Sequence, residues 1–204
     1  MTIEVRRATV DDIPALTGVL SRAFSNDPPM SWVFRDEATR VERLAVLFGG
    51  ALREIFLPAG HLWTTTGVSG AAVWQPPGQW RTPDEVVERL TPPLAEAFLP
   101  EELDRFLTFL GMMEDKHADA PEHWYLEVLA ADLDQQGQGI GSACMLPVLE
   151  LADSGGTPAY LESSNEKNVP LYERHGFRVT DVVDLPDGGP AVWLMWREGT
   201  SAAN

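Results

Sequence analysis

The sequence is poor in cysteine and in long apolar runs. Its one cysteine, Cys144, excludes a disulfide within the chain and is compatible with a reducing cytoplasm. The longest apolar run, residues 44–52, is far shorter than the roughly 20 residues of a membrane-spanning helix. The first residues also lack the apolar core of a signal peptide. We therefore expect a cytoplasmic protein that does not bind a membrane.

Positive charge is also scarce. Fifteen Lys and Arg residues stand against 31 Asp and Glu residues, which gives a formal net charge of −16. Such a field repels phosphates, so nonspecific binding to nucleic acid is not expected. The field would attract a cationic substrate, although solubility alone also explains the charge. The four histidines show no metal-ligand spacing and have no cysteine partner nearby, so we expect no metal site.

The first half of the chain reads as a strand, two helices and a hairpin. Residues 3–7 alternate as a strand does, and a capping box at residues 9–12 leads into a helix that ends before Asn26-Asp-Pro-Pro. A second helix is expected over 37–56, and strands over 61–66 and 71–75 form the hairpin. Residues 83–119 then predict an acidic helical insertion broken by Pro92-Pro93 and Pro100, which is either a lid over a substrate or a solvated surface.

The second half predicts strands separated by helices. Strands are expected over 124–129, 159–163, 179–185 and 191–196, and helices over 139–152 and 169–174. This order favours a mixed α/β sheet with a right-handed crossover. We predict a single domain over residues 1–204, with 83–119 as its insertion.

A glycine-rich turn, QQGQGIGS at residues 135–142, lies between a predicted strand and a predicted helix. The first turn of a helix exposes unpaired N–H groups and the positive end of the helix dipole, and glycines let that backbone approach an anion closely. Neither the P-loop nor the dinucleotide-binding fingerprint fits, because Gly141 is followed by Ser142 and Ala143. From the glycines alone, a phosphate cradle and a plain strand–helix turn remain equal alternatives.

Two ordered motifs extend this interpretation. Residues 136–141, QGQGIG, match the Gln/Arg-x-x-Gly-x-Gly/Ala motif of the GCN5-related N-acetyltransferase (GNAT) superfamily, and Asn165 with LYERHGF at 171–177 matches its later motif. The chain resembles this superfamily, and residues 124–196 are similar to the branch that contains puromycin N-acetyltransferase and its bacterial relatives. The resemblance implies a mixed, mostly antiparallel sheet of about seven strands with flanking helices, the acyl-CoA N-acyltransferase fold.

The resemblance also implies acetyl-CoA as co-substrate. Backbone N–H groups of the glycine-rich turn would hold its diphosphate, and the end of the preceding strand would pair with its pantetheine arm. Tyr172 would act as general acid, because a phenol keeps its proton at neutral pH and can pass it to a thiolate. The residues expected to contact the co-substrate are Leu129, Ala130, Ala131, Gln136, Gly137, Gln138, Gly139, Ile140, Gly141, Ser142, Asn165, Asn168 and Tyr172.

The general base and the acceptor are less well defined. Glu127 and Glu162 each place a carboxylate in an otherwise apolar strand, which suits either a base for an amine or the polar side of an alternating strand. The expected activity is acetyl transfer to a small, possibly cationic amine by direct attack in a ternary complex. The alternatives are a protein amine as acceptor, or a non-catalytic acyl-CoA sensor. We expect a monomer or a homodimer.

Overall fold

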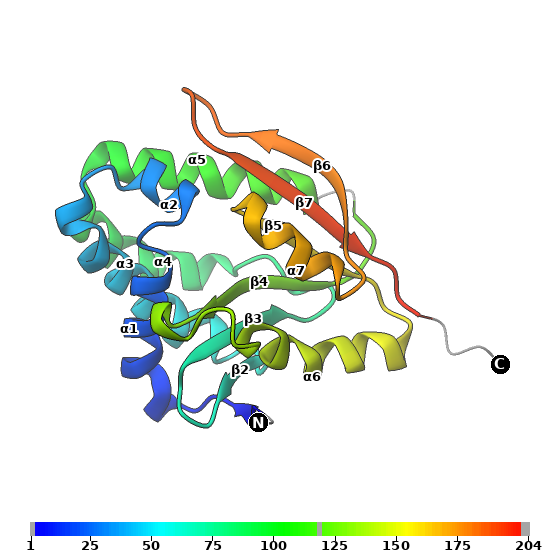
Figure 1. The fold of residues 1–204 in the computed structure, drawn as a ribbon. Coiled ribbons are helices and arrows are strands. Elements are labelled where there is room, and N and C mark those ends of the chain that lie inside the picture. Colours follow the sequence, from blue (N-terminus) through cyan, green and yellow to red (C-terminus); the bar gives the residue numbers. More distant parts are fainter. Residues whose placement is uncertain (1–2, 118–119, 201–204) are drawn as a thin grey trace.

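A seven-stranded sheet organises the computed structural model, which describes residues 3–117 and 120–200. The strand order is β1-β2-β3-β4-β5-β7-β6 (Figure 1). Strands β4 and β5 pair in parallel, and the other five neighbouring pairs are antiparallel. The strands are β1 (Val5–Arg7), β2 (Leu62–Thr65), β3 (Gly70–Gln75), β4 (Trp124–Ala131), β5 (Ala159–Ser163), β6 (Arg178–Asp184) and β7 (Ala191–Arg197). The predicted fold class, a mixed and mostly antiparallel sheet with flanking helices, is confirmed.

Helices cover both faces of the sheet. One face packs against α1, α2, α3 and α5 around residues such as Leu16, Phe48 and Val73. The other packs against α6 and α7 around Trp74, Met145 and Leu161. The helices are α1 (Ile13–Ala23), α2 (Pro28–Val33), α3 (Glu37–Ala51), α4 (Asp84–Ala97), α5 (Pro100–His117), α6 (Ile140–Gly155) and α7 (Val169–Glu173).

The capping box at the start of α1 forms as predicted. The Asp12 carboxylate accepts hydrogen bonds from the Thr9 backbone N–H (2.8 Å) and the Thr9 hydroxyl (3.1 Å). Arg6 on β1 also forms an ion pair with Asp12 at 2.7 Å. The box opens a short 3₁₀ turn, Val10–Asp12, before the α-helix begins at Ile13. These contacts join the first strand to the first helix.

Helix α2 was not predicted. The sequence indicated only a helix end at Asn26-Asp-Pro-Pro, but residues 28–33 form a new helix. The Asp27 side chain accepts a hydrogen bond from the Met30 N–H at 3.2 Å and caps this helix. Pro28 and Pro29 occupy the first turn, where the missing N–H groups would have no helical partner in any case. The prolines therefore start a helix as well as ending one.

The prediction that Pro92 and Pro93 break the acidic segment was wrong. Helix α4 continues through both residues to Ala97, and Pro100 begins α5. Both prolines are exposed, so the carbonyl groups that lose their helical partners can bond to water. Residues 118 and 119, the end of the predicted insertion, lie outside the described residues. Within the described ranges, no helix has the length and apolarity that crossing a bilayer requires.

Candidate active site

The parallel strands β4 and β5 diverge partway along their length. Their register pairs Trp124, Tyr125 and Leu126 with residues 159–161 and then stops, although β4 continues to Ala131. Residues Leu129, Ala130 and Ala131 pair with β3 on their other side. The end of β4 is thus fixed by β3, and its second edge is left free for another partner. This is the edge that the sequence analysis assigned to the pantetheine arm.

A β-bulge sits on β4 where the divergence begins. Trp74 is opposite Leu126 and Val73 is opposite Val128, so no residue of β3 lies opposite Glu127 in the strand register. A bulge adds one residue to a strand and redirects its side chain. The Glu127 carboxylate accepts a 2.6 Å hydrogen bond from the Gln75 side chain of β3. Glu127 is therefore held beside the point at which β4 and β5 separate.

The glycine-rich turn follows β4 and leads directly into α6. Gly137 and Gly139 have φ angles of 76° and 89°, which favour glycine, and Gly139 is the N-cap residue of α6. Among the described residues, the backbone N–H groups of residues 136–139 donate no hydrogen bond outside regular elements. The first helical turn adds further unpaired N–H groups. The turn is exposed and offers a set of neutral donors to an anion.

Close packing of Gly70 places this turn against the sheet. A Cβ atom at Gly70 would lie 2.5 Å from Ile140 Cγ2 and 2.6 Å from the Ala130 carbonyl oxygen. Only glycine therefore lets the start of α6 approach the end of β4 so closely. In the sequence, Gly70 indicates only the end of a hairpin turn, because its close contact is with Ile140, 70 residues further along the chain.

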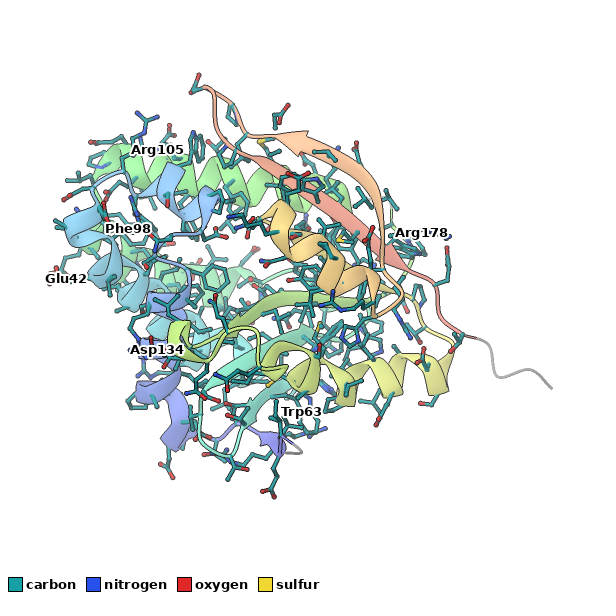
Figure 2. All side chains as sticks on the ribbon, in the orientation of Figure 1. Glu42, Trp63, Phe98, Arg105, Asp134 and Arg178 are labelled. Atoms are coloured by element: carbon teal, nitrogen blue, oxygen red, sulfur yellow. The ribbon has the colours of Figure 1, made fainter. Side chains whose placement is uncertain are left out.

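The two glutamines of the turn make only long hydrogen bonds within the protein. The amide groups of Gln136 and Gln138 reach the carbonyl oxygens of Ala131 and Asp134 at 3.4 Å. Asp134 lies on the exposed loop before α6 (Figure 2). Among the hydrogen bonds of the described residues, neither glutamine forms one shorter than these. Their side chains thus remain able to turn toward a bound molecule.

Ser142 connects the turn to α7. Its hydroxyl lies 2.9 Å from Nε2 of His175, which follows α7 in the chain. Burial lowers the pKa of His175, and the nearby arginines lower it further. The neutral ring therefore forms a hydrogen bond with the serine without adding a positive charge. This bond fixes the C-terminal end of α7 beside the first turn of α6.

Tyr172 lies on α7 and is buried among Phe177 and the residues that pack α6 onto the sheet. Its hydroxyl makes no hydrogen bond to another described residue, and the hydroxyl oxygen is not completely buried. Burial, and then the charge of Asp27, raise the pKa of Tyr172 well above its ordinary value. The phenol thus keeps its proton and has a free hydroxyl.

Asn165 and Asn168 lie in the turn between β5 and α7. The Asn165 side chain accepts a 3.0 Å hydrogen bond from the Lys167 N–H and caps a 3₁₀ turn, Glu166–Asn168. Asn168 is the N-cap residue of α7 but makes no side-chain bond there. A structural role is therefore visible for Asn165, while the amide of Asn168 remains available. The predicted contacts of both with the co-substrate remain predictions.

Asp27 is a residue that sequence reasoning did not single out. Its carboxylate caps α2 and accepts a short hydrogen bond from the hydroxyl of Ser164, which follows β5. Burial raises the pKa of Asp27 to about 6, and these hydrogen bonds oppose the increase. The charge of Asp27 also raises the pKa of Tyr172. Asp27 therefore lies where the α1–α2 loop, the end of β5 and α7 meet. An aspartate before two prolines gives no sign of such a contact.

Glu127 and Glu162 lie together on the face opposite α6. Burial raises the pKa of Glu127 to about 7, and the charge of Glu162 adds to the increase. Glu162 on β5 accepts from, or donates to, Nε2 of His117 at 3.0 Å, and its side chain is 8% exposed. The structure thus brings together the two carboxylates that the sequence singled out. It adds His117 from the end of α5.

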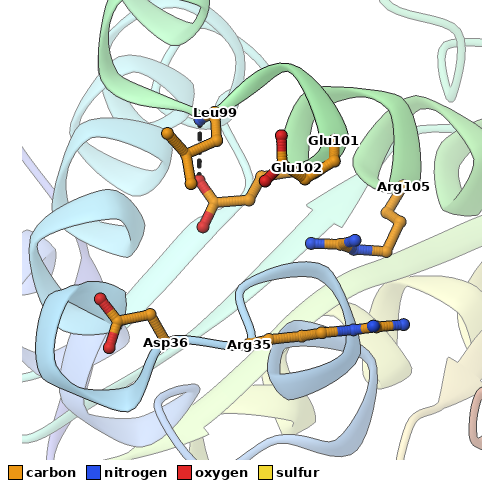
Figure 3. Close-up of a pocket in the computed structure, with 6 residues that line it drawn as sticks. All are labelled: Arg35, Asp36, Leu99, Glu101, Glu102 and Arg105. Atoms are coloured by element: carbon orange, nitrogen blue, oxygen red, sulfur yellow. Dashed lines mark hydrogen bonds between the residues drawn. The ribbon is translucent and has the colours of Figure 1, made fainter.

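A separate hollow of about 300 Å³ lies beside the start of α5 (Figure 3). It contains none of the predicted site residues, and its Glu102 and Arg105 side chains have structural partners. Glu102 accepts from Arg43 at 2.6 Å and from the Leu99 N–H at 2.9 Å, which fastens α5 to α3. Arg105, also labelled in Figure 2, donates to the Val33 carbonyl oxygen at 2.8 Å and 3.0 Å. These contacts hold α5 and α2 together next to the site.

Comparison with known families decides the identity of this arrangement. The profile of the acetyltransferase (GNAT) family matches residues 63–177, which is more than half of the chain. The chain belongs to the GNAT family. The superfamily indicated by the two motifs is thereby confirmed. The matched region contains the GNAT glycine-rich turn, Glu127, Glu162 and Tyr172, whereas Asp27 lies before it.

Individual GNAT relatives agree with this assignment. An uncharacterised N-acetyltransferase of Schizosaccharomyces pombe is 36% identical over 77 residues, which cover 35% of this chain and 31% of the yeast protein. A Corynebacterium glutamicum structure, described as histone acetyltransferase HPA2 and related acetyltransferase, has 25% identity and a TM-score of 0.69 over 100% of both chains. The polyamine N-acetyltransferase of Drosophila melanogaster shares the fold at 15% identity, with a TM-score of 0.63 over 97% of this chain and all of its own.

Proposed function

We propose that this chain is an acetyl-CoA-dependent N-acetyltransferase that acetylates the amine of a small molecule by direct attack in a ternary complex. The observation that carries the proposal is the cradle of neutral N–H donors at the start of α6. In this GNAT chain, the cradle lies next to the free edge of β4 and near the hydroxyl of Tyr172. These three features supply a place for a diphosphate, for an extended amide chain and for a leaving thiolate.

The residues of the site fit acetyl-CoA. Backbone N–H groups of residues 136–142 would bind the diphosphate, since Gly137 and Gly139 leave that backbone exposed without a side chain above it. The free edge of Leu129, Ala130 and Ala131 would pair with the pantetheine amides. Asn165 and Asn168 would contact the same co-substrate from the turn before α7. When bound, acetyl-CoA supplies an acetyl group activated as a thioester.

Proton transfers are assigned to two side chains. Tyr172 holds a proton at its free hydroxyl and would donate it to the departing sulfur. Glu127, with a pKa of about 7, would accept the proton of the attacking amine, directly or through water. Cys144 is fully buried, and burial raises the pKa of its thiol to about 12, so it is a poor nucleophile. This supports direct transfer over a cysteine-linked intermediate.

The α1–α2 segment supports a small acceptor. Residues 26–36 are tied to the end of β5 through Asp27 and Ser164, and to α5 through Val33 and Arg105. A large acceptor would need this segment to be open. Among the fold relatives, the Drosophila enzyme is described as forming N-acetylagmatine, which is a small cationic product. A small amine acceptor and a cytoplasmic location complete the proposal.

The test is an assay of CoA release with a panel of primary amines. We expect thiol release that depends on both acetyl-CoA and an amine, with the acetylated amine identified by mass spectrometry. Tight binding of CoA without acetylation of any small amine would contradict the proposal. If a peptide panel were then also inactive, a non-catalytic sensor would be favoured, whereas acetylated peptides would favour a protein acceptor.

The pH dependence of the Glu127→Gln variant separates catalysis from stability. A base must be ionised, so wild-type kcat/KM should rise with pH through about 7. The Glu127→Gln variant should lose this rise of kcat/KM with pH, and its rate should fall about 10²- to 10⁴-fold.

The same variant also has an expected effect on stability. The pKa of Glu127 is higher in the folded state than in the unfolded state, so ionisation of Glu127 destabilises the fold as the pH rises from the usual carboxyl range to about 7. At pH 8 the variant should therefore melt at a higher temperature than the wild type. If kcat/KM of the variant still rose with pH through about 7, Glu127 would be excluded as the base.

A further inference from the structure

The carboxylates of Glu127 and Glu162 are each satisfied on one oxygen only. Gln75 donates to one oxygen of Glu127, and His117 bonds to one oxygen of Glu162. Among the described residues, the second oxygen of each carboxylate makes no well-formed hydrogen bond, and neither oxygen is sealed from solvent. The hydroxyls of Tyr125 and Tyr160 lie near Glu162 and interact with it. Each carboxylate therefore keeps one oxygen open to a bound donor.

Three fully buried polar atoms near Glu162 have no hydrogen-bond partner among the described residues. They are the Tyr160 hydroxyl, Nδ1 of His117 and Nε2 of His123, on side chains that are buried by more than nine-tenths. Burial, and then the charge of Glu162 and its interaction with the hydroxyl, raise the pKa of Tyr160. The hydroxyl thus lies beside this carboxylate, although no well-formed hydrogen bond joins them. Buried groups without partners cost free energy unless something else bonds to them. Several of them around one carboxylate indicate a binding site.

His117 contacts Glu162 through Nε2 at 3.0 Å and so orients this carboxylate. Its Nδ1 has no partner among the described residues. The nearby Lys116 bonds to Asp181 at 3.4 Å, and the guanidinium of Arg81 lies over Trp80. Among the hydrogen bonds and ion pairs of the described residues, neither of these cations is bonded to Glu162.

Aromatic rings enclose the same place. His117 packs against Tyr125, Tyr160 and Trp80 with ring centroids 4.5, 4.8 and 4.6 Å apart. Tyr160 and Trp196 also line a hollow of about 400 Å³ beside the cluster. Aromatic faces attract ammonium and guanidinium groups, most strongly where water is excluded. The surroundings of Glu162 thus suit an organic cation.

We propose that Glu162 and Tyr160 bind a second cationic group of the acceptor, so that the preferred substrate is a short diamine or a guanidinium-bearing amine. This inference rests on the proposed function. The reactive amine would lie at Glu127, beside the bulge on β4. The second cation would lie at Glu162 on β5, and His117 is the positioning residue that orients this carboxylate. Discrimination against monoamines follows, because they leave Glu162 without its partner.

Comparison of 1,4-diaminobutane with butylamine tests the inference. The wild type should favour the diamine in kcat/KM by about tenfold to a hundredfold, the usual effect of a hydrogen bond to a charged group. Glu162→Gln should reduce this ratio toward one, mainly through the KM of the diamine. Glu150→Gln, which removes the same charge from the exposed surface of α6, is the matched control and should keep the ratio.

The Tyr160→Phe variant tests the inference in case Glu162→Gln fails to fold. The Tyr160 hydroxyl makes no well-formed hydrogen bond to another described residue, so removing it should change the melting temperature little, yet the diamine preference should fall about threefold to tenfold. Equal use of both amines by the wild type, or an equal loss for both in Glu162→Gln, would overturn the inference. Absence of acetyl transfer to either amine would instead contradict the proposed function. In that event, calorimetric titration of 1,4-diaminobutane into the CoA complex still decides, since the inference requires binding that Glu162→Gln weakens.

Discussion

Tyr172→Phe should lower the kcat of acetyl transfer by about 10²- to 10⁴-fold, the range expected for loss of a general acid. The hydroxyl has no hydrogen-bond partner among the described residues, so its removal leaves no protein group unpaired. The ring would still pack against Phe177. We therefore expect the affinity for CoA and the melting temperature to stay close to those of the wild type. Steady-state thiol release, together with direct titration of CoA, measures both quantities.

The pH dependence of the remaining activity gives a second readout. Burial and the charge of Asp27 raise the pKa of Tyr172, so the wild-type phenol stays protonated throughout the useful range of pH. The variant should be slow at every pH, rather than slow on one limb as Glu127→Gln should be. An amine product that forms at the wild-type rate, when a single-turnover experiment shows that chemistry is limiting, would remove Tyr172 from the mechanism.

The local pattern of the sequence predicted most elements of the fold. Strand β5 occupies residues 159–163 as expected, and α6 begins one residue after its predicted start. Both elements follow from short-range signals, such as apolar runs bounded by glycine or proline. The same signals placed the glycine-rich turn before α6. They misjudged residues 28–33 and Pro92-Pro93, because capping by Asp27 and exposure to water decide there whether a proline ends a helix.

The contacts that complete the candidate site are long-range. Ser164 and Asp27 are 137 residues apart, and His117 and Glu162 are 45 apart, yet each pair forms a hydrogen bond. Residue type and periodicity carry no information about such a pair, since each member also has an ordinary local role. The bulge at Glu127 is equally hidden, because it depends on the register between β3 and β4. Sequence motifs thus indicated the co-substrate, whereas the surroundings of the acceptor required the folded chain.

Gly137→Ala should weaken CoA binding by about tenfold to a hundredfold. Alanine disfavours a φ of 76°, so the turn would relax and its N–H groups would move away from the diphosphate. Loss of one hydrogen bond to a charged group costs about 1.5–3 kcal/mol, which gives the expected factor. A Cβ atom at residue 137 would meet nothing within 4 Å, so a steric clash inside the protein does not explain the loss. Calorimetric titration of CoA measures the effect.

Gly60→Ala is the matched control for this change. Gly60 has the same φ of 76° and equally open surroundings, but it lies in the turn before β2. Both variants should therefore lose about 1–2 kcal/mol of stability through the same backbone strain, while only Gly137→Ala should bind CoA less tightly. If the two variants lost stability equally and bound CoA like the wild type, residues 135–142 would be a plain strand–helix turn. A selective loss in Gly137→Ala would instead mean that specificity for the co-substrate lies in the backbone of the turn, where neither charge nor side-chain chemistry is needed.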